Sequence, residues 1–253
     1  RTYSILSCKP ESDGSLEFEH TFEREQEYAI EVIDEQHNRH LTFQIYCLEE
    51  DLYSRRPYRG DLHVHSYYSD GQEAPNVVAA NYRKKGYDFM AQTDHYKFFP
   101  SQLLIEQYKD IPMNFKVFGG EEVHEPNGAD LHIVSFGATC SINEIYQKNA
   151  DGANAEIEEL KKSVPETYPE FFRLSAARRA WLVNKIRENG GMAILAHPHW
   201  ITGNAYNMRT DAIEYAFEHD LFDAYELIGG IPADCKNLKR WFDEVSSRPS
   251  AKA

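Results

Sequence analysis

The sequence lacks any hydrophobic run long enough to cross a membrane. No stretch approaches the roughly 18 uninterrupted apolar residues that a membrane-spanning helix requires. The first residues, RTYSILSCKPESDG, also lack the hydrophobic centre of a signal peptide. These two absences predict a soluble protein that does not interact with a membrane.

Cysteine is scarce and scattered. The chain has 4 cysteines, and none of them is paired with another at the CxxC spacing of a zinc knuckle. Wide separation also gives no disulfide framework of the kind that stabilises small secreted domains. A reducing cytoplasm is therefore the expected compartment. The four positions are Cys8, Cys47, Cys140 and Cys235.

Basic residues are too few to balance the acidic ones. The chain has 27 Lys+Arg against 41 Asp+Glu, a formal net charge of -14, and it contains no run of lysines and arginines. Because affinity for nucleic acids and anionic membranes comes mainly from basic side chains, this balance excludes strong non-specific binding to either. A small phosphorylated substrate is still compatible with it, provided that bound cations reverse the sign of the charge locally.

The composition is that of a globular protein. Hydrophobic residues make up 42% of the 253 residues and aromatic residues 13%, which is far more than a disordered, charge-rich chain carries. A chain of this length buries about 73% of its unfolded surface, which suits one large domain or two smaller ones.

The hydrophobic pattern changes near residue 57. Before it, apolar and polar residues alternate over 16–22, 28–32 and 41–45, which predicts a small antiparallel β unit with a turn near Asn38. After it, short apolar runs alternate with helical stretches. We therefore predict a small, sandwich-like β domain over 1–56, an α/β domain over 57–245 and a flexible tail over 246–253.

The α/β domain is expected to contain parallel strands covered by helices. Helices are predicted at 76–86, 101–110 and 174–191, and the polar segment 144–160 reads as an exposed excursion with a short helix. In parallel barrels the chemistry lies where the strands end. The predicted strands span 61–65, 87–94, 115–122, 131–137, 192–197 and 223–228.

Histidines and carboxylates gather at the ends of these strands. His63 and His65 alternate along the first strand and so share one face, and Asp70 follows them in a turn. Asp94 and His95 end the second strand. Taken singly, the first pair can be incidental, and the second can be a turn that caps the next helix.

The later strands add more groups of the same kind. Of the adjacent Glu121 and Glu122 only one can face the interior, and the alternation favours Glu122. His132 begins the next strand, and His197 and His199 end another. Burying each of these groups alone would cost free energy, whereas a shared metal centre removes that cost. The convergence therefore predicts a metal site.

In order and spacing, these motifs resemble those of the polymerase and histidinol phosphatase (PHP) family of metal-dependent phosphoesterases. The resemblance covers residues from about 60 to 230 and implies a distorted (β/α)7 barrel. It also implies two or three divalent metals, Zn, Mn or Fe, and hydrolysis of a phosphate ester by metal-activated water. The motifs are HVHSYYSDG, QTDH, GGEEV, LHIVSFG and AHPH.

The resemblance also implies roles for individual residues. His63 and His65 would bind a first metal, and Glu122 would bridge it to a second. The other implied ligands are His132 and His197 for the second metal and Asp70 and His95 for a third. Asp94 and His199 would be catalytic residues that support a ligand or face the substrate, His199 as proton donor to the leaving oxygen. Glu226 matches a strand-end carboxylate of the family.

One departure from the family pattern is clear. The family closes with an Asp-x-His motif on a last strand, and the residues after Trp241, FDEVSSRPSAKA, contain none. The predicted barrel could therefore lack its last strand, with an exposed edge that something must cover. We expect the chain to be a fragment of a longer protein, or else to bind fewer metals.

Two other functions stay open at this stage. An amidohydrolase also begins with HxH, although it usually bridges its metals with a lysine where this sequence offers Glu122. The second is an inactive metal-binding module that has lost the final motif.

Overall fold

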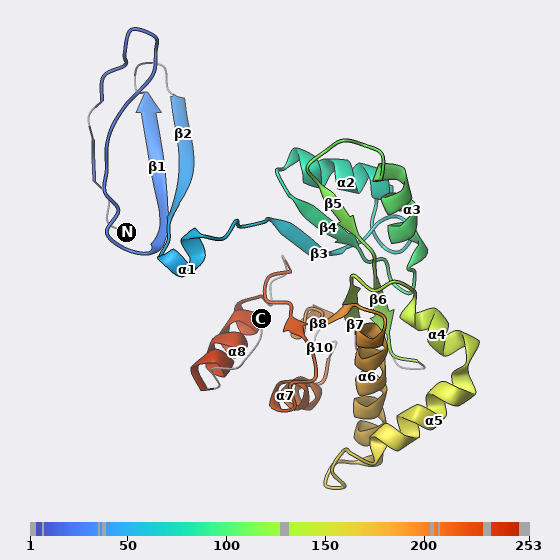
Figure 1. The fold of residues 1–253 in the computed structure, drawn as a ribbon. Helices are drawn as coiled ribbons and strands as arrows, with labels where there is room; N and C mark the ends of the chain where they lie inside the picture. The colour runs from blue at the N-terminus through green and yellow to red at the C-terminus, as the bar shows by residue number, and fades with distance from the viewer. Residues whose placement is uncertain are drawn as a thin grey trace. The chain divides into compact units, whose positions relative to one another are not determined.

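A computed structural model describes residues 4–6, 8–34, 36, 39–126, 132–202, 205–206, 208–229 and 234–247. The chain divides into two compact units, Arg1–Pro57 and Tyr58–Ala253, called here the hairpin unit and the α/β unit. Figure 1 shows the elements of each. Among the described residues, no helix is both long and apolar enough to span a membrane.

The hairpin unit contains two antiparallel strands, β1 (Gln26–Asp34) and β2 (Arg39–Cys47), followed by the short helix α1 (Glu50–Tyr53). Their register pairs Tyr28 with Ile45, Ile30 with Phe43 and Val32 with Leu41. Because side chains alternate along a strand, all six apolar residues lie on one face of the hairpin. The predicted second and third runs are thus the two strands.

The first predicted run of this unit, over 16–22, does not form a strand. This segment contacts the hairpin through side chains and not through a strand ladder: the Phe22 ring lies 4.5 Å from the Tyr28 ring. Alternation indicates that one side of a segment is apolar, but it does not supply a partner strand. The predicted turn near Asn38 lies outside the described residues.

Seven strands of the α/β unit form two sheets. The first is parallel, in the order β3-β4-β5, and contains β3 (Gly60–Val64), β4 (Phe89–Gln92) and β5 (Lys116–Phe118). The second has the order β11-β8-β7-β6. Its strands are β6 (Gly120–His124), β7 (His132–Phe136), β8 (Met192–Leu195) and β11 (Ala224–Tyr225). Strands β9 (Ile201–Thr202) and β10 (Ala205–Tyr206) form a separate small ladder.

The two sheets meet at the end of β4. His95 forms an isolated parallel bridge with Glu122, supported by backbone hydrogen bonds from Tyr96 to Glu122 (3.0 Å) and from Glu122 to Asp94 (3.2 Å). The single predicted strand 115–122 is in fact two, β5 and β6, which separate at Gly119. The fold is mixed α/β, and the ladders seen among the described residues stop short of a closed seven-stranded ring.

The expectation of parallel strands throughout is wrong for β7. This strand is antiparallel to both β6 and β8, while β11 is parallel to β8. The physical reason is the short connection between β6 and β7, which spans only residues 125–131. A parallel crossover needs about a dozen residues or more, so a connection this short returns the chain antiparallel.

Helices cover the sheets, and their bounds agree with the main predictions. The helix α2 (Pro75–Lys84) and the helix α3 (Phe99–Tyr108) contact the β3-β4-β5 sheet. The longest helix, α6 (Glu170–Glu188), buries Trp181, Leu182 and Ile186 in the main core beside β8. The helix α7 (Thr210–Glu218) adds Ile213 to the same core.

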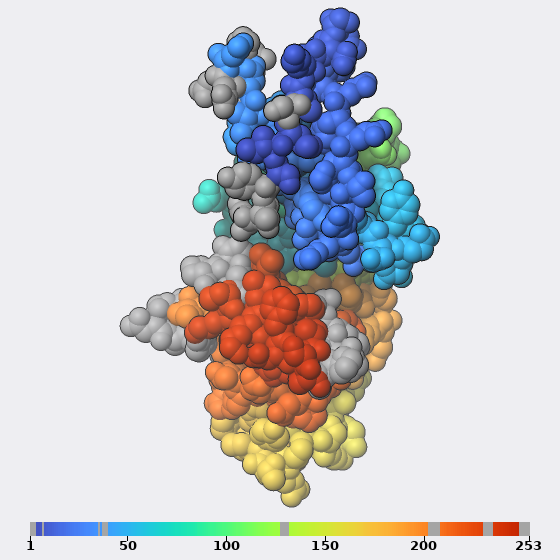
Figure 2. Space-filling view, turned by 90° about the vertical axis from the view of Figure 1, so that its left-hand side faces the viewer, coloured from blue at the N-terminus to red at the C-terminus, as the bar shows by residue number. Residues whose placement is uncertain are grey.

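The last helix, α8 (Asp234–Ser247), packs on α7. Arg240 of α8 forms an ion pair with Glu214 of α7 (2.6 Å) and lies over the Phe217 ring. Figure 2 shows the surface of α8 in red. Because Ser246 and Ser247 end this helix, the predicted tail over 246–253 is wrong at its first two positions. Its remaining residues lie outside the described ranges.

The predicted exposed excursion over 144–160 is also wrong. The segment belongs to two helices, α4 (Ile142–Lys148) and α5 (Ala150–Lys161). Ala153 and Ile157 of α5 are buried in the main core against α6. These two positions are one helical turn apart and form a narrow apolar stripe. The polar residues between them make this stripe hard to recognise in the sequence.

Replacing Ile157 with alanine tests this part of the core. We expect Ile157→Ala to lower the free energy of unfolding by about 2–5 kcal/mol, since it leaves a cavity beside α6. Glu159→Ala, which removes only an exposed ion pair with Lys162, should cost less than about 1 kcal/mol. Urea unfolding followed by tryptophan fluorescence measures both, because all 3 tryptophans lie in the α/β unit. Equal effects of the two substitutions would contradict the burial of Ile157.

Candidate metal centre

A single buried carboxylate, Glu122, lies at the centre of the candidate site. Its side chain is 0% exposed, and imidazole nitrogens of five histidines lie within 3.2 Å of its two oxygens. Oε1 lies 2.7 Å from His132 Nδ1 and 3.2 Å from His197 Nε2. Oε2 lies 2.9 Å from both His65 Nε2 and His95 Nδ1, and 3.2 Å from His63 Nε2.

The strand ends bring these histidines together. His63 lies on β3 and His65 just after it, while His95 follows β4 and His132 begins β7. His197 comes two residues after β8 and has a φ of 28°, in the left-handed region that side chains other than glycine rarely adopt. Its backbone N–H donates to Glu226 Oε2 over 2.7 Å, and this bond holds the turn.

Glu226 therefore supports two of the histidines. The same Oε2 that accepts from the His197 backbone lies 3.1 Å from His63 Nδ1, so the carboxylate orients the imidazole whose Nε2 faces Glu122. A carboxylate on the far nitrogen of an imidazole sets which nitrogen faces a metal and makes it a better ligand. The sequence alone left a surface position equally open for Glu226, whereas the structure places it against the histidine cluster.

Asp70 lies at the edge of the cluster. Its side chain is 62% exposed, and Oδ1 lies 2.5 Å from His65 Nδ1 while Oδ2 lies 3.5 Å from His95 Nε2. The turn after β3 thus carries a carboxylate back onto two of the histidines. All seven residues that the sequence indicated as metal ligands lie in this one region: His63, His65, Asp70, His95, Glu122, His132 and His197.

The side chains of the two candidate catalytic residues have other hydrogen-bond partners. Asp94 is fully buried, and its carboxylate accepts hydrogen bonds from the Ser66 backbone N–H and from the side chains of Ser66, Ser69 and Gln92. These bonds tie the end of β4 to the turn that carries Asp70. Asp94 therefore positions that turn. Its contacts do not indicate a direct role on substrate.

His199 contacts the last helix. Its Nδ1 lies 2.7 Å from Oδ1 of Asn237 on α8, and the Asn237 side chain is buried. Because an amide oxygen only accepts hydrogen bonds, Nδ1 of His199 carries the proton in this contact. Residues from two distant parts of the chain are joined here, which the sequence did not indicate.

Sequence reasoning missed His124. This residue ends β6, two positions after Glu122, and its Nε2 lies 2.7 Å from His95 Nδ1. The predicted strand over 115–122 stops short of it, and the motif GGEEV ends at Val123. The alternation that selected Glu122 over Glu121 could have found it, since residues 122 and 124 share a face of the strand.

The electrostatics of the cluster depend on one buried negative charge, the carboxylate of Glu122. Burial raises the pKa of the Glu122 carboxyl, but the neighbouring His132, His197 and His63 lower it far below its ordinary range. Burial lowers the pKa of His63, yet hydrogen bonds to Glu122 and Glu226 outweigh this and raise it to about 10. Burial and repulsion from His132 lower the pKa of His124 to about 3. Protons and metal ions compete for these nitrogen atoms.

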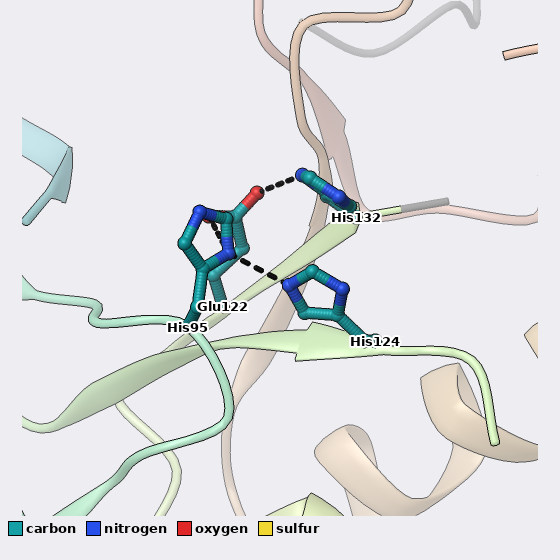
Figure 3. A group of neighbouring side chains, drawn as sticks. All are labelled: His95, Glu122, His124 and His132. Atoms are coloured by element: carbon teal, nitrogen blue, oxygen red, sulfur yellow. Dashed lines mark hydrogen bonds and ion pairs between the residues drawn. The ribbon is translucent and has the colours of Figure 1, made fainter. Parts of the chain in front are cut away.

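The donor set fits divalent cations. Within the described part of the chain, Glu122 Oε2 and His132 Nδ1 are enclosed and have no partner in hydrogen-bond geometry, although nitrogen and oxygen atoms lie close by. Such converging atoms suit a shared cation better than they suit each other. Three overlapping groups have ligand atoms within 4.8 Å of one another: His63, His65 and Glu122; His65, Asp70 and His95; and His95, Glu122, His124 and His132 (Figure 3).

Comparison with known proteins gives the fold. No family model and no curated protein matches the chain. A solved structure from Bifidobacterium adolescentis, to which metal-dependent phosphoesterase activity has been ascribed, is similar with a TM-score of 0.50. The two chains are 18% identical, over 76% of this chain and 85% of that one. The chain has the fold of a PHP-like metal-dependent phosphoesterase.

Two further solved structures are similar at lower scores. One is a two-domain protein from Bacteroides vulgatus that contains a predicted PHP-like metal-dependent phosphoesterase; it is 14% identical, over 74% of this chain and 49% of that one, with a TM-score of 0.47. The other is an amidohydrolase from Chromobacterium violaceum with bound sulfate, 17% identical over 76% of this chain and 84% of that one, with a TM-score of 0.49.

The adjacent glutamates Glu121 and Glu122 provide a matched test of this candidate metal centre. Both are fully buried, but Glu121 accepts hydrogen bonds from Ser141 and from backbone N–H groups at the start of α4. We expect Glu122→Gln to lose divalent metal affinity by at least about 100-fold, because an amide is a poor bridge between cations. Glu121→Gln should retain the metal and lower the free energy of unfolding by about 1–3 kcal/mol.

Isothermal titration calorimetry with Zn²⁺ and Mn²⁺ measures the affinities, and thermal unfolding measures the stabilities. Equal metal affinity in the two variants would show that Glu122 is not the central ligand.

Proposed function

We propose that the α/β unit is a metal-dependent phosphoesterase that hydrolyses a small phosphorylated substrate. The observation that carries the proposal is the convergence of five histidines from different strand ends on the buried carboxylate of Glu122. A cluster with so many nitrogen donors serves no evident packing role. The shared fold with a protein of ascribed phosphoesterase activity supports the same reading.

The proposed ligands follow from the contacts. His63 and His65 would hold one cation, Glu122 would bridge, and His132 with His197 would hold a second; Asp70 and His95 lie where a third could bind. Mixed imidazole and carboxylate donors suit Zn, Mn or Fe. Bound divalent cations would supply charge for phosphoryl oxygens and lower the pKa of a water molecule to near neutrality.

The charge balance favours an anionic substrate. Three carboxylates contact the histidines described above, Glu122, Asp70 and Glu226, and they contribute three negative charges. Two divalent cations would contribute four positive charges, so the loaded centre would be net positive even with every histidine neutral. A phosphate ester is stabilised by that charge, whereas a neutral amide gains much less. The chemistry of the site thus favours a phosphoesterase over an amidohydrolase.

His199 is the proposed proton donor to the leaving oxygen. Its hydrogen bond to Asn237 Oδ1 holds the imidazole through Nδ1, so that Nε2 is the nitrogen that would deliver the proton. Asn237 acts as the positioning residue of this pair. Asp94 acts one step further away, because it holds the turn on which Asp70 lies.

We also propose the domain division and the cellular location that the sequence predicts. The hairpin unit over 1–56 and the catalytic unit over 57–245 would be separate domains. The absence of paired cysteine spacing favours a cytoplasmic location.

A phosphatase assay with added metal tests the proposal. The full chain is incubated with Mn²⁺ or Zn²⁺ and with a panel of small phosphate esters. We expect turnover that falls at least about 100-fold in Glu122→Gln, because the bridge between the cations is lost. His40→Ala, which removes an exposed histidine of the hairpin unit, is the control and should keep full activity.

The outcomes separate the alternatives. Equal turnover in the wild type and Glu122→Gln would refute the site assignment. Hydrolysis of amides without hydrolysis of phosphate esters would identify an amidohydrolase. Tightly bound metal with no turnover on any ester would identify an inactive metal-binding module.

The role of His199 predicts a dependence on the leaving group. We expect His199→Gln to slow hydrolysis of alkyl phosphates by about 100-fold or more, because a poor leaving group needs a proton. Aryl phosphates such as p-nitrophenyl phosphate, whose leaving group departs without one, should be slowed much less. Asn237→Ala should show the same pattern more weakly. Steady-state kinetics on both ester classes measures this, and equal slowing for both classes would exclude proton donation by His199.

A further inference from the structure

His124 belongs to the metal centre by its place in the sheet. It is two residues after Glu122 on β6, so both side chains project from the same face of the strand. In the antiparallel ladder it lies directly opposite His132 of β7, and directly opposed residues have neighbouring side chains on one face. The sheet itself therefore brings Glu122, His124 and His132 together.

The atoms of His124 point into the cluster. Its Nε2 lies 2.7 Å from His95 Nδ1, and its ring centroid lies 4.1 Å from that of His132. Figure 3 shows the four side chains of His95, Glu122, His124 and His132 facing one another. One ligand atom from each lies within 4.8 Å of the other three. A single ion placed among them can therefore reach all four.

The His124 ring is also held in place. The residue is only 8% exposed, and the Tyr96 ring stacks on the imidazole with centroids 3.9 Å apart and an interplanar angle of 22°. Tyr96 has a φ of 59°, a left-handed conformation that costs a tyrosine free energy. Its backbone N–H donates to the carbonyl oxygen of Glu122 over 3.0 Å. Such an outlier is a pointer to function when it orients a side chain at a site.

We propose that His124 is a metal ligand and that, with His95, His132 and Glu122, it forms a subsite for Zn²⁺. Three imidazoles and one carboxylate are a tetrahedral donor set rich in nitrogen, which zinc accepts readily. This assignment rests on the proposed function only in requiring that the centre binds metal. It revises the ligand set given under the proposed function, and implied by the family resemblance, in which His124 has no part and His95 serves a third metal.

The two nitrogens of His95 have different roles in this arrangement. Nδ1 faces His124 and Glu122, so it is the ligating atom, while Nε2 lies 3.5 Å from Asp70 Oδ2. Asp70 then orients the ligand instead of binding a third ion, as carboxylates commonly do at the far nitrogen of a ligating histidine. The expected stoichiometry is two ions per chain, one on the His63 side of Glu122 and one at the His124 subsite.

The test measures zinc affinity and not turnover. The metal-free full chain is titrated with Zn²⁺ against a chromophoric chelator, for the wild type, His124→Ala and the control His40→Ala. We expect two sites in the wild type and in His40→Ala. In His124→Ala one site should weaken by at least about 100-fold, more than the 10–100-fold typical for loss of a group behind a ligand, while the other site is unchanged.

The outcomes distinguish this inference from the proposed function. Wild-type zinc affinity in His124→Ala would overturn the inference and leave the phosphoesterase proposal standing. A wild-type chain that binds no divalent ion would overturn both. Circular dichroism and thermal unfolding establish that the variants are folded.

A second variant separates ligation from a structural role. His124→Glu exchanges a nitrogen donor for an oxygen donor of similar reach, so we expect the subsite to survive and its preference for Zn²⁺ over Mn²⁺ to fall about tenfold or more. Loss of packing alone would weaken both ions alike. An unchanged ratio of zinc to manganese affinity in His124→Glu would therefore overturn the assignment, even if His124→Ala did not fold.

Discussion

The structure of the α/β unit depends on how one buried charge is neutralised. An ionised carboxylate inside a protein is costly unless opposite charge or hydrogen bonds surround it, and Glu122 has no exposed surface at all. Five imidazoles supply what the solvent cannot. Because these histidines come from β3, β4, β7 and β8 or from the turns that follow them, the two sheets must meet at this residue for the charge to be tolerated. The bridge between His95 and Glu122 is that meeting point.

Two other carboxylates hold parts of the histidine cluster in position, in different ways. Glu226 reaches from the segment after β11 to both the His197 backbone and the His63 imidazole, so it links two strand ends across the second and first sheets. Asp94 accepts hydrogen bonds from Ser66, Ser69 and Gln92, so it fixes the turn that places Asp70 beside the cluster. Positioning groups of this kind matter because ligation tolerates little displacement of the donor atoms.

How far the sequence could predict this molecule depends on the kind of signal. The alternation His63-x-His65 and the choice of Glu122 over Glu121 follow from the period of a strand, and the structure places these side chains together. His124 was missed because the predicted strand ends at residue 122, two residues early, and β6 ends with that histidine. The antiparallel β7 and the buried Ile157 depend on connection length and tertiary packing, which hydrophobic periodicity does not report. The contact between His199 and Asn237 joins residues 38 apart and left no local pattern to read.

The acidity of the chain and a phosphorylated substrate are compatible because they act over different distances. A net charge of -14 repels an anion at long range, but salt screens exposed charges beyond about 8 Å at physiological ionic strength. At the proposed centre the relevant charges would be those of the cations and of three carboxylates, which would lie a few ångströms apart and be screened much less than distant surface charges. Short-range attraction to those cations would outweigh the distant repulsion. The imidazoles would contribute to this result by binding cations without adding negative charge, and His124, as a further neutral donor beside His95, would shift the balance in the same direction.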